Sequence, residues 1–584
     1  MSLMKMIQTV LKDLYRHRYT YTLRGMVLQL VVTLGGSFVL SLLFRMLLIS
    51  SHLPGITTDN LGSFLANPVT LLLLLGYLFA LAFLVYFEFS LLVEMIRHKE
   101  AKLSLTFRRL RTDTLNFLRS ISGWHLFAFI FYLVLTLPFL QFLFSSVLLE
   151  GLYIPKFLTG ELLKSTQGKW LYYSLYLGLA YLNIRLIFTI PFTVTGQGER
   201  FVYHMLSSWR ETKGVKSFRL FGLVIALLIL MFIMGVISSI GIGIASYLDS
   251  HQDNLLIEVL FLSFIWGLSF VGTLLFKLTS LSYLLTLIGR DRADHLSEAS
   301  RERVKRRGML LLVLVTIIGG VSLIYNSIQA SDKAETNAQI LAHRGDVNKG
   351  VENSLEALEA AAKEGADYVE MDVILSKDKQ FIVSHDNNLK RLTGKDKLIS
   401  QSKARDVIGL ATHQNGHTSR IVSFDTYVAK AKELGVKLLV ELKPTGEEPE
   451  DYEQLFVTKL KELGVSQTYL AMSLKLATIE KVEKLAPEIQ TGYTISLQLG
   501  DFTSQVVDFY ALEEFSYNKL LVDRAHHLKK KVFIWTVNDT DDIDKYLQTD
   551  VDGVITDYPA LVKSEKELLN KDQSYLAYFL RLMQ

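Results

Sequence analysis

Residues 340–386 decide the fold of the polar part of this chain, and they read ILAHRGDVNKGVENSLEALEAAAKEGADYVEMDVILSKDKQFIVSHD. Apolar runs at 339–342, 367–375 and 380–384 alternate with an amphipathic stretch at 354–364, which is the pattern of strands joined by a helix. Polar residues follow the end of each apolar run. Short apolar strands separated by helices indicate a parallel sheet, whose functional side chains gather at the carboxyl ends of the strands.

The same alternation continues toward the end of the chain. Further strands are expected at 436–442, 468–472, 490–495, 531–537 and 553–555, with helices at 451–463, 474–485, 522–530 and 541–547. Residues 387–430 look irregular and polar, with a helical end. About 250 residues with up to eight such units predict an α/β (β/α)8 TIM barrel, and a doubly wound open sheet is the alternative.

The first 330 residues have the composition of a membrane domain. The chain has 584 residues, of which 50% are hydrophobic, and its mean hydropathy is +0.28. Seven apolar runs are long enough to cross a ~30 Å hydrocarbon core. They lie at about 26–49, 70–94, 123–147, 170–195, 218–247, 255–288 and 308–329. We therefore expect an α-helical transmembrane bundle at 1–330, a linker at 331–339 and a TIM barrel at 340–584.

Lysine and arginine predict the orientation of this bundle. The N-terminal 25 residues and the segments 95–122, 196–219 and 289–307 hold 24 of them, against three in the intervening segments. By the positive-inside rule the N-terminus is cytoplasmic, and seven crossings place the polar domain outside the cell. The sequence thus predicts a multi-pass protein of the cell membrane with an extracellular C-terminal domain.

A few polar residues interrupt the apolar runs. Glu88, Arg185 and Lys277 would be costly against lipid, so we expect them to face the bundle interior, as an internal ion pair or in a polar cavity, unless Glu88 and Lys277 snorkel from span ends. The stretch 103–120 is expected to be an interfacial helix or only a cytoplasmic loop. The chain has no cysteine, which excludes disulfides and cysteine-ligated metal sites.

Spacing along the strands indicates a charged cluster. Side chains alternate along a strand, so Glu370 and Asp372 point to one side, and so do Glu441 and Lys443. Inside a barrel such charges must be paired or bind a metal. Converging carboxylates raise one another's pKa, and a hard divalent cation such as Mg²⁺ or Ca²⁺ relieves the repulsion. The alternative is that Glu370 and Asp372 form salt bridges with Arg344 or Lys443.

Taken together, these motifs resemble those of the glycerophosphodiester phosphodiesterase family over about 337–570. The resemblance rests on His-Arg-Gly at 343–345, Glu-Asn-Ser at 352–354, Glu-x-Asp at 370–372, the run from Lys-Asp to His-Asp at 377–386, Glu-x-Lys at 441–443, Trp-Thr-Val-Asn at 535–538 and Asp-Gly-Val-Ile-Thr-Asp-Tyr-Pro at 552–559. The membrane half looks like the multi-span domain of some bacterial members. Val351, Ser354 and Lys379 depart from the family's proline, threonine and glycine, but they remove no catalytic group.

The resemblance assigns a role to each polar residue of the site. It implies Glu370, Asp372 and Glu441 as metal ligands, His343 and His385 as an acid–base pair, and Arg344 and Lys443 as phosphate-binding residues. Glu352 and Asn353 are expected to brace the site, Asn353 by capping the first helix or by holding the His-Arg-Gly loop. Glu352 could also touch the metal. Trp535 offers an apolar wall for glycerol or belongs to the core. We expect His413, His417, His526 and His527 at the surface.

The expected function is metal-dependent hydrolysis of glycerophosphodiesters to an alcohol and glycerol phosphate at the outer membrane surface. The nucleophile is water or a neighbouring glycerol hydroxyl. Tethering favours a membrane-proximal substrate, such as teichoic acid or a lipid headgroup, although soluble deacylated headgroups also fit. The alternative is a receptor or transporter whose outer domain only binds phosphodiesters. We expect membrane lipid as a partner and no nucleic acid, and the sequence decides neither the oligomeric state nor the choice of cation.

Overall fold

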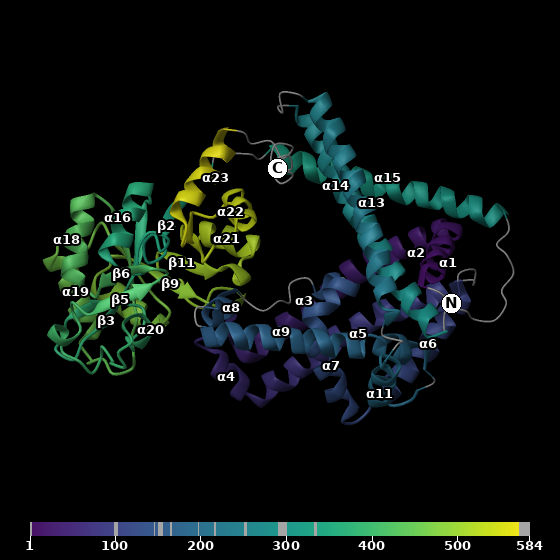
Figure 1. Cartoon of the computed structure of the whole chain (residues 1–584), viewed down its shortest axis with the longest axis horizontal. Coiled ribbons are helices and arrows are strands. Elements are labelled where there is room, and N and C mark those ends of the chain that lie inside the picture. Colours follow the sequence, from purple (N-terminus) through teal and green to yellow (C-terminus); the bar gives the residue numbers. More distant parts are fainter. Residues whose placement is uncertain are drawn as a thin grey trace.

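A computed structural model describes the chain in two parts, a helical part and a β/α part. The described residues are 3–98, 103–144, 146–149, 156–163, 166–196, 198–214, 218–249, 254–289, 301–331 and 336–571. Figure 1 shows the helices of the N-terminal part on the right and the β/α domain on the left. Residues 332–335 of the expected linker, residues 290–300 of the basic segment and residues 572–584 lie outside the described residues.

Long helices make up the N-terminal part. In chain order these are α1 (Leu3–Arg16), α2 (Arg18–Leu30), the π-helix η1 (Val31–Gly36), α3 (Ser37–Ser51), α4 (Leu61–Ala66), α5 (Pro68–Arg97), α6 (Leu103–Ser120), α7 (His125–Phe144), the 3-10 helix η2 (Val147–Leu149), α8 (Lys156–Leu163), α9 (Thr166–Leu186), α10 (Thr189–Thr195), α11 (Phe201–Glu211), α13 (Phe221–Leu248), α14 (Leu255–Leu287) and α15 (Arg301–Ser331). The helices α13 and α14 run side by side (Figure 1) and pack against each other.

Six described helical segments are long and apolar enough to cross a membrane. They are Arg18–Ser51, Pro68–Arg97, Thr166–Thr195, Phe221–Leu248, Leu255–Leu287 and Lys305–Ile328. A seventh crossing is obtained only if Arg111–Ser120 and His125–Thr136, which are bent by 99° to each other, count as one broken span. The second helix of the pair, α7, lies within the span that the sequence predicts at 123–147, and the first, α6, turns away from the axis of α7.

The three charged residues predicted within the spans are buried in the helical part. Glu88 on α5 accepts hydrogen bonds from Lys277 on α14 at 2.5 Å and from the hydroxyl of Ser146 at 2.6 Å. Both charged side chains are almost fully buried, so the expected internal ion pair is confirmed for them. Arg185 instead donates to the carbonyl oxygens of Trp209 and Thr212 and lies over the Trp209 ring. Pairing of this kind offsets the cost of burying a charge.

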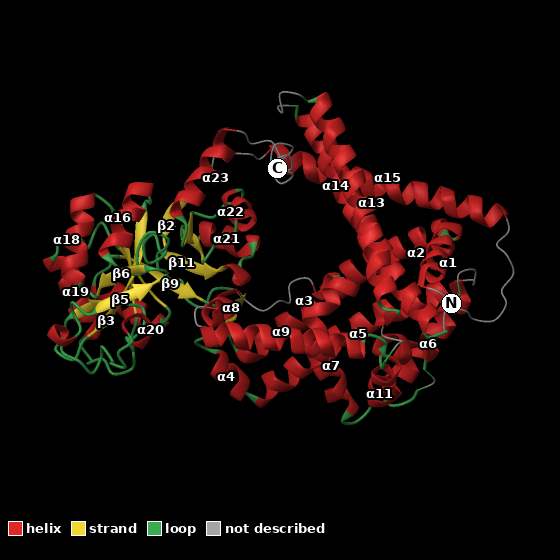
Figure 2. Cartoon of the chain, viewed as in Figure 1, coloured by secondary structure: helices red, strands yellow, loops and turns green. Residues whose placement is uncertain are grey.

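Eight parallel strands close the C-terminal domain into a barrel. They are β2 (Gln339–Ala342), β3 (Tyr368–Leu375), β7 (Lys437–Leu442), β8 (Leu470–Ser473), β9 (Gln490–Ile495), β11 (Phe509–Glu513), β12 (Lys531–Trp535) and β13 (Gly553–Thr556). Neighbours pair in this order, and β13 returns to β2. Figure 2 shows helices around these strands. The predicted TIM barrel is confirmed, and the doubly wound alternative is not.

Helices connect the strands of this barrel and cover its outside. They are α16 (Leu355–Glu364), α18 (Phe424–Leu434), α19 (Tyr452–Glu462), α20 (Leu476–Leu485), α21 (Lys519–His527), α22 (Thr540–Leu547) and α23 (Pro559–Lys571). Short insertions add α17 (Lys390–Thr393), the 3-10 turns η3 (Ala404–Asp406) and η4 (Glu514–Ser516), and a hairpin of β5 (Ala411–Gln414) and β6 (His417–Arg420). The hairpin and α17 lie within 387–430, where the sequence predicts irregular structure with a helical end; the helical end is the start of α18.

The strand predicted at 380–384 is present as β4 (Phe381–Val383), but its place differs from the expected parallel arrangement. It pairs antiparallel with β3 and is not one of the eight barrel strands. An apolar run of three residues gives no sign of its direction, so the hairpin could not be distinguished from a stave. The barrel strand β11 is not predicted by the sequence, because its five residues lie between polar segments without a clear turn signal.

Apolar residues fill the barrel interior below its carboxyl-terminal mouth. This interior cluster consists of Leu341, Tyr368, Leu439, Leu470, Met472, Phe509, Ala511, Phe533 and Ile555. Because side chains alternate along each strand, the next inward position on β3 after Tyr368 is Glu370, followed by Asp372, and the next on β7 after Leu439 is Glu441. The charged residues therefore lie above a packed apolar floor, at the end where TIM-barrel sites are built.

Candidate active site

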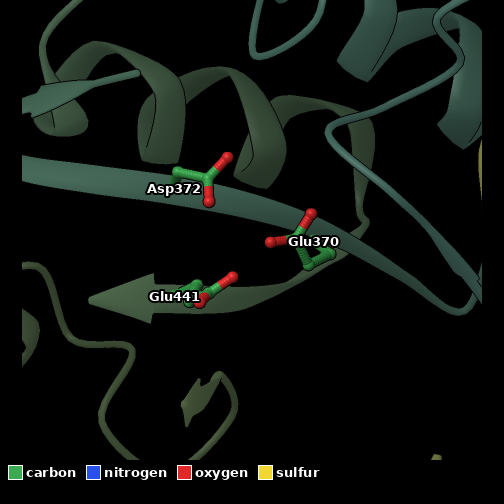
Figure 3. A group of neighbouring side chains, drawn as sticks. All are labelled: Glu370, Asp372 and Glu441. Carbon is green, nitrogen blue, oxygen red and sulfur yellow. The ribbon is translucent and has the colours of Figure 1, made fainter. Parts of the chain in front are cut away.

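Three carboxylates meet at the mouth of the barrel. Glu370 and Asp372 extend from β3, and Glu441 extends from the neighbouring strand β7, as Figure 3 shows. One oxygen of each lies within 4.8 Å of the others, and all three side chains are buried. The strand register explains the proximity, because Asp372 and Glu441 are direct partners across the two strands.

Two basic side chains lie beside this cluster, but their positive charges do not neutralise all three carboxylates. Lys443 Nζ is 2.9 Å from Glu441 Oε1 and 3.3 Å from Asp372 Oδ1, and Arg344 Nε is 3.3 Å from Asp372 Oδ2. Burial acts to raise the pKa of Asp372, but Lys443 and Arg344 outweigh it and hold that pKa below its usual value. Burial and the charges of Asp372 and Glu441 raise the pKa of Glu370 well above its usual value.

Glu370 is therefore the carboxylate that the described cations leave uncompensated. Its Oε2 accepts the backbone N–H of Arg344 at 2.9 Å. Its buried Oε1 accepts no hydrogen bond from any residue that the structure describes. Salt bridging to Arg344 or Lys443, the alternative to metal binding, accounts for Asp372 and Glu441 but not for this oxygen. Asp372 Oδ1 and Glu441 Oε1 likewise accept no hydrogen bond from the described residues, although Lys443 lies beside both. A set of three oxygen donors, each with such a buried atom, fits a hard divalent cation such as Mg²⁺ or Ca²⁺.

His343 follows β2 and is held by a carboxylate from the last stave. Its Nδ1 lies 2.7 Å from Asp557 Oδ1, and the side-chain amide of Asn538 donates to Asp557 Oδ2 at 2.6 Å. Burial acts to raise the pKa of Asp557, but the charge and hydrogen bond of His343 outweigh it and lower that pKa. The ring is fixed through Nδ1, so Nε2 is the atom available for proton transfer.

His385 follows β4 and has the same arrangement. Its Nδ1 lies 2.8 Å from Asp386 Oδ1, and Arg391 Nε donates to Asp386 Oδ2 at 2.6 Å. Burial acts to raise the pKa of Asp386, but hydrogen bonds with His385 and Arg391 lower it to about 2. Both imidazoles thus have a carboxylate on Nδ1, which is how an acid–base histidine is kept in one orientation.

Glu352 binds cationic and amide groups. Its carboxylate accepts hydrogen bonds from Arg344 at 3.1 Å, from Arg391 Nη1 at 2.9 Å and from the side chain of Gln414 at 2.6 Å. It is not among the three carboxylates that converge. Glu352 therefore connects the phosphate-binding candidate Arg344 to Arg391, which in turn holds the carboxylate beside His385.

Asn353 supports a carboxylate of the cluster. Its Nδ2 donates to Asp372 Oδ2 at 2.8 Å, and its Oδ1 accepts the backbone N–H of Asp372 at 3.1 Å. Its own N–H donates to the carbonyl of Arg344 at 2.9 Å, which holds the His-Arg-Gly loop. The cap of α16 is the neighbouring Ser354, whose hydroxyl accepts from Ala357 N–H. Arg344 and Asn353 both have φ near +60°, a conformation that non-glycine residues adopt rarely and that clusters at functional sites.

The structure also places Trp535 and the four other histidines of the barrel. Trp535 ends β12, donates its indole N–H to the carbonyl of Ala511 at 2.8 Å and packs against the interior cluster, so it belongs to the top layer of the core. The imidazole of His417 contacts the carbonyl of Asn348, and that of His526 contacts Asp552 at the opposite end of β13. His413 and His527 are exposed.

The sequence analysis assigns no role to four residues of the site. Asp557 and Asp386 orient the histidines, and Arg391 and Gln414 hold Glu352. The two aspartates stand at strand ends within recognisable motifs, so their position was a usable signal. Arg391 and Gln414 lie in the insertion at 387–430, where nothing in the pattern marks them.

Comparisons with known proteins identify the family of the chain. Residues 7–320 match the membrane domain of glycerophosphoryl diester phosphodiesterase, and residues 343–561 match the glycerophosphoryl diester phosphodiesterase family. A glycerophosphodiester phosphodiesterase of Caldanaerobacter subterraneus subsp. tengcongensis is 27% identical over 229 residues, which are 38% of this chain and 94% of that enzyme. A human lysophospholipase D is 44% identical over 63 residues, which are 11% of this chain and 20% of that enzyme.

A solved structure of an Oleispira antarctica phosphodiesterase, in complex with the product sn-glycerol-3-phosphate, is 25% identical. The match covers 39% of this chain and 96% of that protein, with a TM-score of 0.35. The two family matches span both parts of the chain, and the prediction of an enzyme is confirmed. The chain therefore belongs to the glycerophosphoryl diester phosphodiesterase family, in which its polar domain is the phosphodiesterase and its helical part is the family's membrane domain.

Proposed function

We propose that this chain hydrolyses glycerophosphodiesters with one divalent cation, Mg²⁺ or Ca²⁺. The proposed ligands are Glu370, Asp372 and Glu441, the proposed acid–base pair is His343 and His385, and the proposed phosphate-binding residues are Arg344 and Lys443. The observation that carries the proposal is the convergence of the three buried carboxylates, each with an oxygen that accepts no hydrogen bond from the described residues. The cation, when bound, would stabilise the negative charge that develops on the phosphoryl oxygens.

The other groups of the site have the chemistry that the reaction needs. Hydrolysis must take a proton from the nucleophile and give one to the leaving alkoxide, and two imidazoles held through Nδ1 can do both through Nε2. Arg344 and Lys443 supply positive charge to the phosphodiester, and their present carboxylate partners are the groups that a cation would engage instead. Glu352 and Asn353 hold Arg344 and Asp372 in place.

Release of glycerol phosphate by the full-length chain tests the metal and the histidines. We expect chelation by EDTA to abolish release and Mg²⁺ or Ca²⁺ to restore it. His343→Ala and His385→Ala should each lower kcat by about 10²-fold or more, the contribution typical of a general acid or base. The exposed His527→Ala is the matched control and should be neutral. Activity that survives chelation would remove the metal assignment, and unaffected histidine variants would remove the acid–base assignment.

We also propose that the catalytic domain lies outside the cell. The positive-inside pattern supports this, and so does an antiparallel pairing between β1 (Gly55–Thr57), which follows the first span, and β10 (Gln498–Gly500) of the barrel. Two segments that pair must lie on the same side of the membrane. The crossings between them must then be even in number, so the total is odd. Seven spans meet this condition, with the bent α6–α7 pair as the additional crossing, and six do not.

An outer, membrane-tethered hydrolase fits a substrate at the membrane surface. Teichoic acid and lipid headgroups both carry glycerophosphodiesters there, and the similarity to a lysophospholipase D supports a lipid substrate. Full-length protein in bilayers should hydrolyse such substrates faster than the same phosphodiester free in solution. Equal rates on both would favour a soluble deacylated headgroup instead.

A further inference from the structure

The loop between the first two spans is part of the catalytic domain's rim. This rim loop comprises residues 52–67 and includes β1 and α4. Its strand β1 pairs with β10, with Gly55 opposite Gly500, Ile56 opposite Leu499 and Thr57 opposite Gln498. The pairing is extended by Asp501, whose N–H donates to the carbonyl of Pro54 at 2.9 Å. Because β10 directly follows stave β9, the loop lies at the carboxyl-terminal end of the barrel, where the carboxylate cluster is.

Asp59 joins this loop to a second part of the rim. Its Oδ2 accepts the backbone N–H of Leu476 at 3.1 Å and the hydroxyl of Tyr493 at 3.2 Å. Leu476 is the first residue of α20, and Lys475, the residue before it, makes no side-chain cap. Asp59 therefore caps a barrel helix from another part of the chain, where its negative charge also favours the helix N-terminus.

The turn that Asp59 caps is linked by hydrogen bonds to the end of strand β7. The N–H of Lys475 donates to the hydroxyl of Ser473 at 3.1 Å, and that hydroxyl donates to the carbonyl of Leu442 at 2.9 Å. Leu442 stands between Glu441 and Lys443. A short chain of hydrogen bonds thus runs from the rim loop to the strand end that carries a proposed metal ligand and a proposed phosphate-binding residue.

The other side of the rim loop is fixed to the membrane helices. Ile56 is buried with Leu47 of α3 and Phe64 of α4 in one apolar cluster. Asn60 stabilises the loop internally, because its side chain accepts a hydrogen bond from Thr57 N–H and donates one to the carbonyl of Gly55. Gly55 is required at its position, because an added Cβ would lie 2.1 Å from the carbonyl oxygen of Asp501. The loop is therefore a rigid bridge between the ends of two spans and the rim.

We propose that the rim loop, through Asp59 and β1, holds the barrel mouth at the membrane surface and makes the enzyme selective for glycerophosphodiesters that have one end anchored in the bilayer. This inference rests on the proposed function. Asp59 is a positioning residue, because it contacts the rim and not the reacting phosphate. Losing it frees the α20 turn and Tyr493 from the rim loop, so that the mouth is less firmly fixed where an anchored diester can enter.

Choline release from two substrates with the same scissile bond tests the selectivity. The full-length chain in lipid nanodiscs is given soluble glycerophosphocholine, or lysophosphatidylcholine embedded in the same nanodisc. Asp59→Ala should lower kcat/KM for the embedded substrate by about fivefold or more, the factor that loss of one helix cap carries, mainly through KM. Soluble turnover should stay within about twofold. Asp59→Asn keeps the cap acceptor and should recover most of the loss.

Asn67→Ala is the matched control. Asn67 caps α5 at the end of the same loop, and its side chain accepts from the first residues of that helix, so this variant loses a cap of a membrane helix instead of a barrel helix. An Asp59→Ala chain that loses both activities equally, or neither, would overturn the selectivity. A wild-type chain that releases choline from neither substrate would instead overturn the proposed function.

A crosslink tests the docking independently of activity. The chain has no cysteine, so Ile56→Cys with Leu499→Cys introduces the only two thiols, at positions opposite each other in the antiparallel pair. Such partners lie close enough for a disulfide. Mild oxidation should close it, and the crosslinked chain should still hydrolyse embedded lysophosphatidylcholine. Ile56→Cys with Leu485→Cys, at the far end of α20, is the control and should not crosslink. Absence of the first crosslink, or inactivity of the crosslinked chain, would overturn the proposal.

Discussion

The two histidines of the site differ from the others in how their carboxylate partners lie. His343 and His385 have an aspartate on Nδ1 at the mouth of the barrel, whereas His526 contacts Asp552 at the opposite end of β13. Proton transfer needs an imidazole of fixed orientation, and a carboxylate on one ring nitrogen provides it. The functional distinction therefore lies in position within the barrel and not in the type of pair.

Asp557→Asn should lower kcat by about 10-fold to 100-fold, the usual cost of removing a group that orients a functional histidine, and should change KM little. The amide can no longer stabilise the protonated imidazole, and it can hold the wrong tautomer. Steady-state kinetics on glycerophosphocholine measure the effect. Asp552→Asn, which breaks the remote His526 pair, is the matched control, and it should leave kcat unchanged even if it lowers the melting temperature. Equal kcat losses in both variants would argue against an orienting role for Asp557.

Glu370 should determine how the metal-free protein responds to a cation. Burial and two neighbouring carboxylates raise its pKa, so the metal-free site contains an unfavourable interaction that Glu370→Gln removes. We expect the metal-free variant to melt at a higher temperature than the metal-free wild type. A cation at 100 times its Kd stabilises a protein by about 2.7 kcal/mol, and the variant should lose most of this rise. Calorimetry with and without Mg²⁺ or Ca²⁺ measures both effects.

The surface Glu433→Gln, on α18, serves as the control for that experiment and should keep the full cation-induced rise. A Glu370→Gln protein that is stabilised by the cation as strongly as the wild type would show that Glu370 is not a ligand.

At the level of elements, two neighbouring residues at the start of α16 have different roles. Ser354 caps the helix, and Asn353 supports the carboxylate of Asp372. Ser354→Ala removes the cap and should cost about 1 kcal/mol of stability with little effect on metal affinity. Asn353→Ala leaves the cap but removes both hydrogen bonds to Asp372, and it should weaken metal binding by about 10-fold to 100-fold. Calorimetric titration with the cation measures the affinity, and thermal melting measures the stability. Metal binding weakened equally in both variants would mean that Asn353 acts only through the helix.

Much of the barrel was predictable because its determinants are local. Apolar runs of four to eight residues, each ending in a polar motif, marked most of the staves, and the alternation along β3 and β7 placed Glu370, Asp372 and Glu441 on inward positions. The same local signal failed at β4, where a hairpin strand looks like a stave, and at β11, whose pairing partners β9 and β12 decide its role. Periodicity identifies a strand, but only its neighbours define its direction and place.

The rest of the site depends on contacts between distant parts of the chain. Gln414 reaches Glu352 from a hairpin in the segment 387–430, which has no periodic pattern. The pairing of β1 with β10 joins residues more than 400 positions apart, as the contact between Thr58 and Ser496 illustrates. The three-residue sequence of β1, Gly-Ile-Thr, does not indicate that β10 is its partner. Sequence reasoning therefore recovered the residues that carry the proposed chemistry but not most of those that hold them in place.

For the whole molecule, the count of crossings determines where the chemistry takes place. The pairing of the rim loop with the barrel requires an odd number of spans, whereas only six described segments qualify without the bent α6–α7 pair. If that pair crosses the membrane, the start of α9 lies outside and the helix α11 lies inside. If it does not cross, these two positions exchange sides, and the barrel lies on the side opposite the rim loop.

Single cysteines in this cysteine-free chain, labelled with a membrane-impermeant maleimide, distinguish the two arrangements. We expect Gln167→Cys, at the start of α9, and Glu433→Cys, on the barrel surface, to be labelled in intact cells. Lys213→Cys, which follows α11, should be labelled only after the membrane is opened, because the basic segment 196–219 stays in the cytoplasm. All three positions are exposed, so a failure to react reports the side of the membrane and not burial. Labelling of Lys213→Cys in intact cells together with protection of Glu433→Cys would place the hydrolase inside and contradict the docking of the rim loop.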